Sequence, residues 1–252
     1  MSNKNSFKNA VLIVIGNEIL SGRTQDKNIN YIAKEFFSHG ISLEEVRVIP
    51  DIKKTIVKTI KSLKNKFNYI ITTGGIGATH DDITAESISL ALKKEYLLNH
   101  KALLELKKYY KKKSDLTDAR KKMAYMPKGS KIIINKISGA PGFQIENIFV
   151  FAGIPLIVKA MMKEFLKTVK TKNKIYSKSI TTKLYESIIA SSLKETEMRF
   201  KNVKVGSYPI FDGKFKGVEV VLNSYSKIDI TNAFKYLKKE LNKKIWVLVK
   251  LL

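Results

Sequence analysis

Three polar segments of the sequence contain residue types that bind phosphate or a metal ion. The first begins at Gly16-Asn17-Glu18 and continues to Asn28, the second is Asp51, and the third runs from Thr72 to Thr84. Each segment follows a short apolar run that is typical of a buried strand. Because ligands bind at the carboxyl ends of strands in open parallel α/β sheets, we expect the three segments to lie close together.

The third segment contains a glycine-rich loop. Gly74, Gly75 and Gly77 come directly after the strand expected at 69–73. Glycines at this point let the backbone approach a ligand without an intervening Cβ. With the start of the following helix, their N–H groups can hold a phosphate. The spacing matches neither the dinucleotide fingerprint nor the P-loop, so the glycines alone are a weak signal.

Two adjacent carboxylates, Asp81 and Asp82, follow the glycines. Capping of the next helix explains one of them. Two carboxylates beside a bound phosphate would repel it and each other, and a divalent cation resolves that conflict because it takes both kinds of oxygen as ligands. The pair therefore predicts a metal ion next to the phosphate.

Other positions leave two interpretations open. Asp51, after a proline, is placed to cap a helix over 52–64, or it belongs to the ligand site. Glu18 is a surface residue or binds a metal or a polar group of the ligand. His80 lies inside the glycine loop and is a candidate for a phosphate or metal contact. Pro141-Gly142 forms a tight turn or a loop that lies against the ligand.

The elements that must position these residues alternate between strands and helices up to about residue 170. This alternation predicts an α/β domain with a largely parallel sheet. Strands are expected at 11–15, 43–49, 69–73, 131–135 and 148–151, and helices at 28–38, 52–64, 84–92, 101–112, 116–125 and 156–169.

A polar stretch at 170–174 marks the expected boundary between a domain over 1–170 and a smaller one over 171–252. Beyond it the order of elements changes to βαββαβ, a pattern of small α+β domains. The expected elements are strand 176–184, helix 186–200, strand 203–209, a turn at Asp212-Gly213, strand 217–223, helix 229–242 and strand 245–250.

Composition limits the class of protein. The chain has 252 residues, of which 44% are hydrophobic and 27% charged, the balance of a globular protein. It contains no cysteine, which excludes disulfides, thiolate metal sites and cysteine nucleophiles. Every apolar run is shorter than the roughly 18 residues that a membrane helix needs, and the N-terminus does not resemble a signal peptide. We therefore expect a cytoplasmic protein without a membrane partner.

Charge is the one extreme feature, because 47 basic residues give a net charge of +25. Such an excess is typical of proteins that bind nucleic acid or phosphorylated ligands. Only four of these residues are arginines, which read guanine and phosphate forks in a bidentate manner. The lysines are scattered along the whole chain. We interpret them as a solvated surface and do not expect a nucleic-acid partner.

The order of short motifs resembles the molybdopterin-binding MoaB/Mog-like domain, in the version found in the competence/damage-inducible protein CinA and in eukaryotic FAD synthase. The resemblance covers roughly residues 10–250 and implies a three-layer α/β/α domain followed by a small α+β domain. The motifs are Gly16-Asn17-Glu18-Ile19-Leu20-Ser21-Gly22, Asp26-x-Asn28, Thr73-Gly74-Gly75-Ile76-Gly77, Thr79-His80-Asp81-Asp82, Lys122-Met123-Ala124, Ala140-Pro141-Gly142-Phe143, Gly153-Ile154-Pro155 and Gly206-Ser207-Tyr208-Pro209.

The resemblance implies a nucleotide or pterin phosphate as ligand. The wider superfamily binds and adenylylates molybdopterin, the CinA-type branch cleaves dinucleotide pyrophosphates such as ADP-ribose, and the FAD synthase domain hydrolyses FAD. We therefore expect a pyrophosphatase that uses Mg²⁺, Mn²⁺ or Co²⁺, with K⁺ present, and forms a homo-oligomer. The alternative is a binding protein of molybdenum-cofactor metabolism without hydrolytic activity, and a nucleic-acid-binding protein ranks third.

The resemblance also assigns roles to residues. Asp51 and Asp82 correspond to the functional aspartates, which makes capping a weaker explanation for both. The expected site comprises catalytic Asp51 and Asp82, metal ligands Asp81 and Asp82, and ligand-binding positions Gly16, Glu18, Asp26, Asn28, Gly74, Gly75, Gly77, Thr79, His80, Pro141 and Gly142.

The sequence departs from the family pattern in two places. Ala78 replaces a common proline, so we expect a less rigid loop. The amidase domain that follows in full-length CinA is absent, so deamidation of nicotinamide mononucleotide is not expected. The C-terminal segment lacks the G-x-x-G loop of KH modules, and we expect it to serve packing or oligomerisation.

Overall fold

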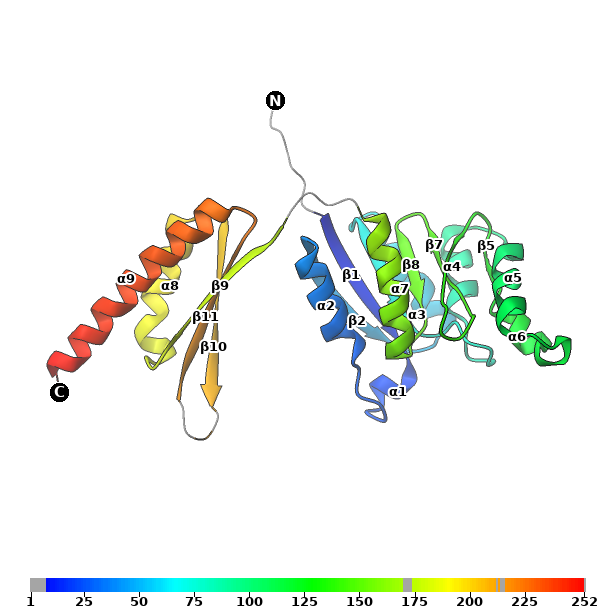
Figure 1. Ribbon diagram of the computed structural model, residues 1–252, viewed down its shortest axis with the longest axis horizontal. Helices are drawn as coiled ribbons and strands as arrows, with labels where there is room; N and C mark the ends of the chain where they lie inside the picture. The colour runs from blue at the N-terminus through cyan, green and yellow to red at the C-terminus, as the bar shows by residue number, and fades with distance from the viewer. Residues whose placement is uncertain (1–7, 170–173, 212, 214–215, 252) are drawn as a thin grey trace, which may run out of the picture. The chain divides into compact units, whose positions relative to one another are not determined.

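A computed structural model describes residues 8–169, 174–211, 213 and 216–251 (Figure 1). The chain divides into two compact units, Met1–Lys172 and Asn173–Leu252. The polar stretch expected at the domain boundary, 170–174, lies mostly outside the described residues, as does Asp212 of the predicted turn. Each unit has its own buried hydrophobic residues, in two clusters in the first unit and one in the second.

The first unit is built on a six-stranded mixed sheet with the order β2-β1-β3-β8-β7-β6. Its first four strands in that order run parallel, and β7 is antiparallel to both of its neighbours. The strands are β1 (Lys8–Ile15), β2 (Ile41–Ile49), β3 (Tyr69–Thr73), β6 (Lys131–Ile133), β7 (Gly142–Ile145) and β8 (Ile148–Phe151).

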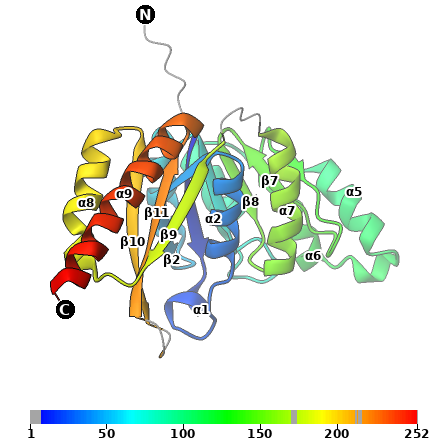
Figure 2. The same ribbon diagram turned by 60° about the vertical axis from the view of Figure 1, so that its left-hand side comes forward.

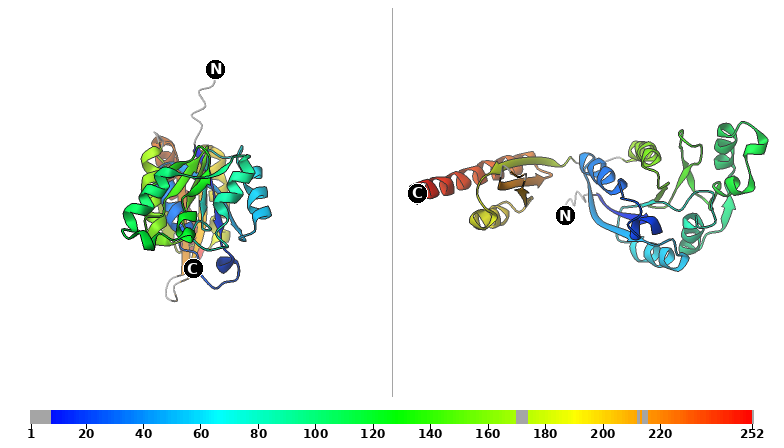
Figure 3. Two further views of the ribbon diagram at one scale, coloured as in Figure 1. Left: turned by 90° about the vertical axis from the view of Figure 1, so that its right-hand side faces the viewer. Right: turned by 90° about the horizontal axis from the view of Figure 1, so that it is seen from below.

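Both faces of this sheet are covered by helices (Figure 3). The odd-numbered residues of β1 from Val11 to Ile15 pack in one core with α3 and α4, and the even-numbered residues from Ala10 to Val14 pack in the other with α2 and α7. The three-layer α/β/α architecture is therefore confirmed. The helices are α2 (Asn28–Ser38), α3 (Lys53–Leu63), α4 (Thr84–Leu92) and α7 (Pro155–Thr168).

A two-stranded ribbon, β4 (Tyr96–Leu98) with β5 (Tyr125–Pro127), extends this unit. Between its strands lie α5 (His100–Tyr109), a 3₁₀ turn (Lys113–Asp115) and α6 (Asp118–Lys122). The helix predicted over 116–125 is thus wrong in length. Pro127 disfavours helical backbone at Met126, and the segment from Tyr125 pairs with β4 as a strand instead.

Two further differences concern the strands on the antiparallel side of the sheet. The strand predicted over 131–135 ends at Ile133, because the Asn135 side chain organises a turn by accepting from Ile137 N and donating to the Ala140 carbonyl. The segment from Gly142, predicted as part of a tight turn or of a loop against the ligand, begins β7. A Cβ at Gly142 would lie 2.3 Å from the Val150 carbonyl oxygen, so this strand pairing requires glycine.

The second unit is a three-stranded antiparallel sheet, β10-β11-β9, with two helices against one face (Figure 2). Val218, Val220 and Leu222 alternate along β11 and are buried in the core on that face. The small α+β domain is therefore confirmed. Its elements are β9 (Tyr176–Thr182), α8 (Glu186–Arg199), β10 (Val203–Phe211), β11 (Lys216–Ser224) and α9 (Lys227–Leu251).

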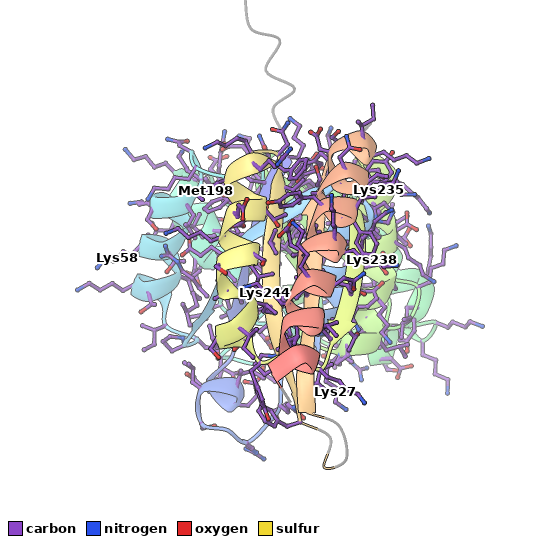
Figure 4. The ribbon with its side chains drawn as sticks, turned by 90° about the vertical axis from the view of Figure 1, so that its left-hand side faces the viewer. Lys27, Lys58, Met198, Lys235, Lys238 and Lys244 are labelled. Carbon is purple, nitrogen blue, oxygen red and sulfur yellow. The ribbon has the colours of Figure 1, made fainter. Side chains whose placement is uncertain are left out.

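The strand predicted over 245–250 is wrong, since α9 continues to Leu251 and the order is βαββα. Buried Ala233, Leu237 and Leu241 recur every four residues, and neither glycine nor proline interrupts the helix before the apolar run. Lys244 joins the two helices, because its Nζ donates to the Ile188 carbonyl at 2.6 Å and to Ser191 Oγ at 3.0 Å (Figure 4).

Lysines occupy the solvent side of α9, as Lys235 and Lys238 illustrate (Figure 4). Among the described helices, none combines the length and the apolar composition that crossing a bilayer requires.

Phe165 anchors the core between α7 and the sheet. It is 1% exposed, and its ring centroid lies 4.6 Å from that of Phe149 and 5.4 Å from that of Tyr69. We expect Phe165→Ala to lower the free energy of unfolding of the first unit by about 3–5 kcal/mol in a urea titration. Phe37→Ala, at a 38% exposed position of α2, is the matched control and should cost under about 1 kcal/mol. Equal losses in the two variants would contradict this packing.

Candidate functional site

The carboxyl ends of β1, β2 and β3 meet at one edge of the sheet. Ile15 is in register with Ile49, and Val14 with Thr73. The loop after β1 stays tied to the end of β2, because Gly16 N donates to the Ile49 carbonyl at 3.1 Å. The three polar segments singled out in the sequence are therefore brought together at this edge.

The glycine loop after β3 lies tightly against its surroundings. Gly74 has a φ of +100° and Gly75 a φ of +67°, both in the region that favours glycine. A Cβ at Gly74 would lie 2.1 Å from the Ile15 carbonyl oxygen, and one at Gly75 would lie 2.2 Å from Thr84 Oγ1. The loop therefore passes between the end of β1 and the start of α4 with no room for a side chain at either position.

Asp51 belongs to this loop cluster and does not cap α3. Its Oδ2 accepts a hydrogen bond from Asn17 N at 2.8 Å, and α3 begins at Lys53 with Ile52 at the N-cap position. Its Oδ1 would lie 3.5 Å from a Cβ built on Gly75, so the carboxylate faces the glycine loop. The capping interpretation of Asp51 is therefore wrong.

The surroundings of Asp51 raise the pKa of its carboxyl group above the ordinary value. Burial is the largest cause, and the negative charges of Glu18 and Asp81 act in the same direction. The hydrogen bond from Asn17 N opposes the shift. Glu18 and Asp81 therefore both act on the ionised form of Asp51 through like-charge repulsion.

The Asp82 carboxylate stabilises the glycine loop by accepting hydrogen bonds from Thr79. Its Oδ2 accepts from Thr79 N at 2.9 Å and from Thr79 Oγ1 at 2.5 Å. A Cβ at Gly77 would lie 2.6 Å from the same oxygen, so the loop closes tightly around the carboxylate. Ile83 occupies the N-cap position of α4, and the capping interpretation of Asp82 is therefore also wrong.

Two predicted ligand residues support the fold of the site. Asp26 Oδ1 accepts from Ile29 N in the first turn of α2 at 2.7 Å. Asn28 is 5% exposed, and its Nδ2 donates to the Gly153 carbonyl at 2.8 Å. Gly153 lies behind the glycine loop, where a Cβ on it would be 3.5 Å from Gly74 Cα. Asn28 therefore holds the loop from the back.

The remaining predicted positions fall into three groups. Gly16 lets the Glu18 carboxylate fold back, because a Cβ there would lie 2.6 Å from Glu18 Oε1. His80 is exposed next to Asp81. Pro141 lines a small cleft beside the loop, whereas Gly142 is buried in β7. The cleft is lined by Ile76, Gly77, Asp82, Ala85, Tyr96, Lys122, Met123, Tyr125, Pro141 and Phe143.

Two residues at the site were missed in the sequence. Lys122 Nζ donates to the Thr79 carbonyl at 2.6 Å and so reaches the glycine loop from α6. Its position in the Lys122-Met123-Ala124 motif was the available signal, hidden among many lysines. Thr84 Oγ1 is fully buried at the start of α4 and has no hydrogen-bond partner among the residues that the structure describes.

The donor set at this edge consists of carboxylate, hydroxyl and backbone oxygens, which suit a hard divalent cation such as Mg²⁺ or Mn²⁺. In the described part of the chain, no three His, Asp or Glu side chains converge as a site made of protein ligands alone requires. An ion bound here would therefore also need oxygens from a ligand, and phosphate supplies them.

Comparisons with known proteins match both units. The family described as "Probable molybdopterin binding domain" matches residues 11–171, and "FAD synthase, middle domain" matches residues 174–250. A protein of Pyrococcus furiosus is 34% identical over 245 residues, which cover 92% of this chain and 96% of that protein. A CinA-like protein of Thermosipho melanesiensis is 32% identical over 248 residues, which cover 96% of this chain and 61% of that protein.

One solved structure is similar both in sequence and in fold. It is that of the protein CinA from Thermoplasma acidophilum, which is described as having unknown function. The TM-score is 0.61 at 30% identity, over 64% of this chain and 98% of that chain.

Gly74 and Gly22 offer a matched test of the close approach at the loop. Both have positive φ, but a Cβ at Gly22 would meet no described atom within 4 Å. We expect Gly22→Ala to cost about 1–2 kcal/mol from backbone strain alone. Gly74→Ala adds a steric clash with the Ile15 carbonyl oxygen. It should lower the free energy of unfolding by about 2–5 kcal/mol in chemical denaturation. Similar costs for both would argue against the close approach.

Asp51→Asn tests whether the Asp51 charge opposes folding. The unfolded carboxyl has an ordinary pKa of 3.8 and the folded one a raised pKa, so the contribution of Asp51 to stability falls as pH rises through that interval. The amide oxygen of Asn can still accept from Asn17 N. At pH 7 we therefore expect an unchanged Tm or a rise of up to about 3 °C, and a smaller difference at pH 4. A clear loss of Tm at pH 7 would refute this electrostatic account.

Proposed function

The chain belongs to the family with a probable molybdopterin-binding domain, followed here by an FAD synthase middle domain, and we propose that it is a metal-dependent nucleotide pyrophosphatase. Its substrate class is a dinucleotide-type diphosphate such as ADP-ribose or FAD. The observation that carries the proposal is the Asp51 carboxylate facing a Cβ-free glycine loop that is braced by Asp82. This arrangement combines a phosphate cradle with oxygen donors for a cation.

The diphosphate would lie along Gly75–Gly77, at the start of α4. Backbone N–H groups there, together with the helix dipole, favour a bound anion. The nine-residue helix α4 is long enough for its first turn to contribute, and the buried Thr84 hydroxyl lies beside the loop. Because the glycines leave no Cβ in the way, a phosphate can approach the backbone closely.

Asp51 and Asp81 would hold a divalent ion together with substrate phosphate oxygens, in line with the donor set described above. When bound, such an ion polarises the phosphoryl group and lowers the pKa of water. Asp51 would orient the attacking water and accept its proton, because its carboxylate faces the glycine loop along which the diphosphate would lie. Attack of water on phosphorus would break one P–O bond of the diphosphate and release AMP.

A second candidate is binding without hydrolysis. The matched family is described by molybdopterin binding, and the same loop would hold a pterin phosphate equally well. In that case the carboxylates would serve to hold an ion and its ligand. Titration with molybdopterin, combined with the hydrolysis assay below, separates the two functions.

The decisive experiment is a hydrolysis screen on the purified protein. ADP-ribose, FAD, NAD and ATP are each incubated with Mg²⁺, Mn²⁺ or Co²⁺ in the presence of K⁺, and released AMP is quantified. We expect AMP from ADP-ribose or FAD, and a loss of at least about 100-fold in Asp82→Ala with folding retained.

Asp118→Ala provides the control, because the Asp118 side chain is 96% exposed and pairs with Lys121 on α6. Its turnover should match that of the unmodified protein. Absence of AMP with every metal would reject the pyrophosphatase, and tight molybdopterin binding would then favour the second candidate.

A further inference from the structure

Three consecutive basic residues end α6, and each has a different environment. The Arg120 guanidinium lies 4.4 Å over the Tyr110 ring, within the same segment. Lys121 pairs with Asp118 one turn earlier at 2.8 Å. Lys122 instead reaches 43 residues back in the sequence to donate to the Thr79 carbonyl at 2.6 Å. Only the third of these bases is therefore directed at the glycine loop.

The contact places the positive charge of Lys122 beside the glycine loop, close to negatively charged side chains. Lys122 lines the same cleft as Gly77 and Asp82, and it is the one lysine or arginine among the described residues that line it. The negative charges of the site are Glu18, Asp51 and Asp81, and Lys122 interacts electrostatically with Asp81. A diphosphate adds further negative charge, which backbone dipoles alone offset only in part.

The present partner of Lys122 is a weak competitor for a phosphate. In the bond to the Thr79 carbonyl only the Lys122 ammonium group is charged, whereas a phosphate oxygen is charged as well and adds Coulomb attraction. Thr79 keeps its other anchors, since its N–H and hydroxyl both donate to Asp82. Lys122 can therefore leave the carbonyl without releasing the loop.

We propose that Lys122 binds the diphosphate of the substrate, exchanging the Thr79 carbonyl for a phosphate oxygen at the Gly77 end of the loop. The inference rests on the proposed function for its substrate, and it makes the site selective for ligands with two linked phosphates. One phosphate lies at the glycine loop, and the linked phosphate lies within reach of the Lys122 ammonium group once that group has left the Thr79 carbonyl.

The test uses pyrophosphate itself as the probe, measured by calorimetry on the full chain without metal and with Mg²⁺. Lys122→Met should weaken binding by about 10- to 100-fold, because it removes a charge-assisted hydrogen bond. Lys121→Met is the matched control on the same helix and should bind as the unmodified protein does. In the hydrolysis assay, Lys122→Met should raise KM for ADP-ribose more than it lowers kcat.

Two conservative variants separate charge from loop support. Lys122→Arg keeps the charge, whereas Lys122→Gln keeps only a neutral donor for the Thr79 carbonyl. We expect Arg to restore most of the pyrophosphate affinity and Gln to restore little. Equal rescue by both variants would overturn the proposal in favour of loop support.

The inference and the proposed function fail in different ways. Pyrophosphate affinity that changes less than twofold in Lys122→Met, or an unmodified protein that binds no pyrophosphate, would overturn the role of Lys122. An unmodified protein that binds pyrophosphate through Lys122 but releases no AMP from any substrate would reject the pyrophosphatase and leave the diphosphate site standing.

Discussion

The rest of the site depends on how closely the backbone of Gly74 approaches the end of β1. With the Ile15 carbonyl only 2.1 Å from where a Cβ would be, the loop can follow this path only as glycine. The path is held from behind by Asn28 through Gly153, and Gly74 N donates to the Phe151 carbonyl at 3.1 Å. Four parallel strands thus fix one short loop, in which Asp82 is held by Thr79, while Asn17 N holds the Asp51 carboxylate beside it.

The parallel strands and the glycine loop hold the Asp51 carboxylate in a position that is electrostatically unfavourable. Burial and the neighbours Glu18 and Asp81 raise the pKa of Asp51, so its ionised form opposes folding at neutral pH. Functional sites commonly retain such groups at some cost in stability. A bound cation would relieve the repulsion, whereas the scattered lysines of the surface act only through their long-range field.

The sequence predicted the parallel core and the edge of the site because both depend on local signals. Short apolar runs followed by glycine or proline marked the ends of β1, β2 and β3 correctly. The errors arose where tertiary contacts override such signals. Gly142 becomes part of a strand because β8 approaches it closely, and α9 continues through an apolar run because no residue ends the helix. Asp51 looked like a cap because its true partner, Asn17, is remote in sequence.

Lys122 illustrates a limit of a different kind. In a chain with 47 basic residues, no single lysine stands out by type. The partner of Lys122, Thr79, lies 43 residues earlier in the sequence, before α4, β4 and α5. The sheet edge supplies the carboxylates and the glycine loop, while the ribbon segment supplies Tyr96, Lys122 and Tyr125 as the wall of the cleft. In the proposed function, chemistry and recognition would therefore come from different parts of the same unit. A change in the ribbon can alter which phosphate ligand fits and leave the parallel strands, and the carboxylates that follow them, unchanged.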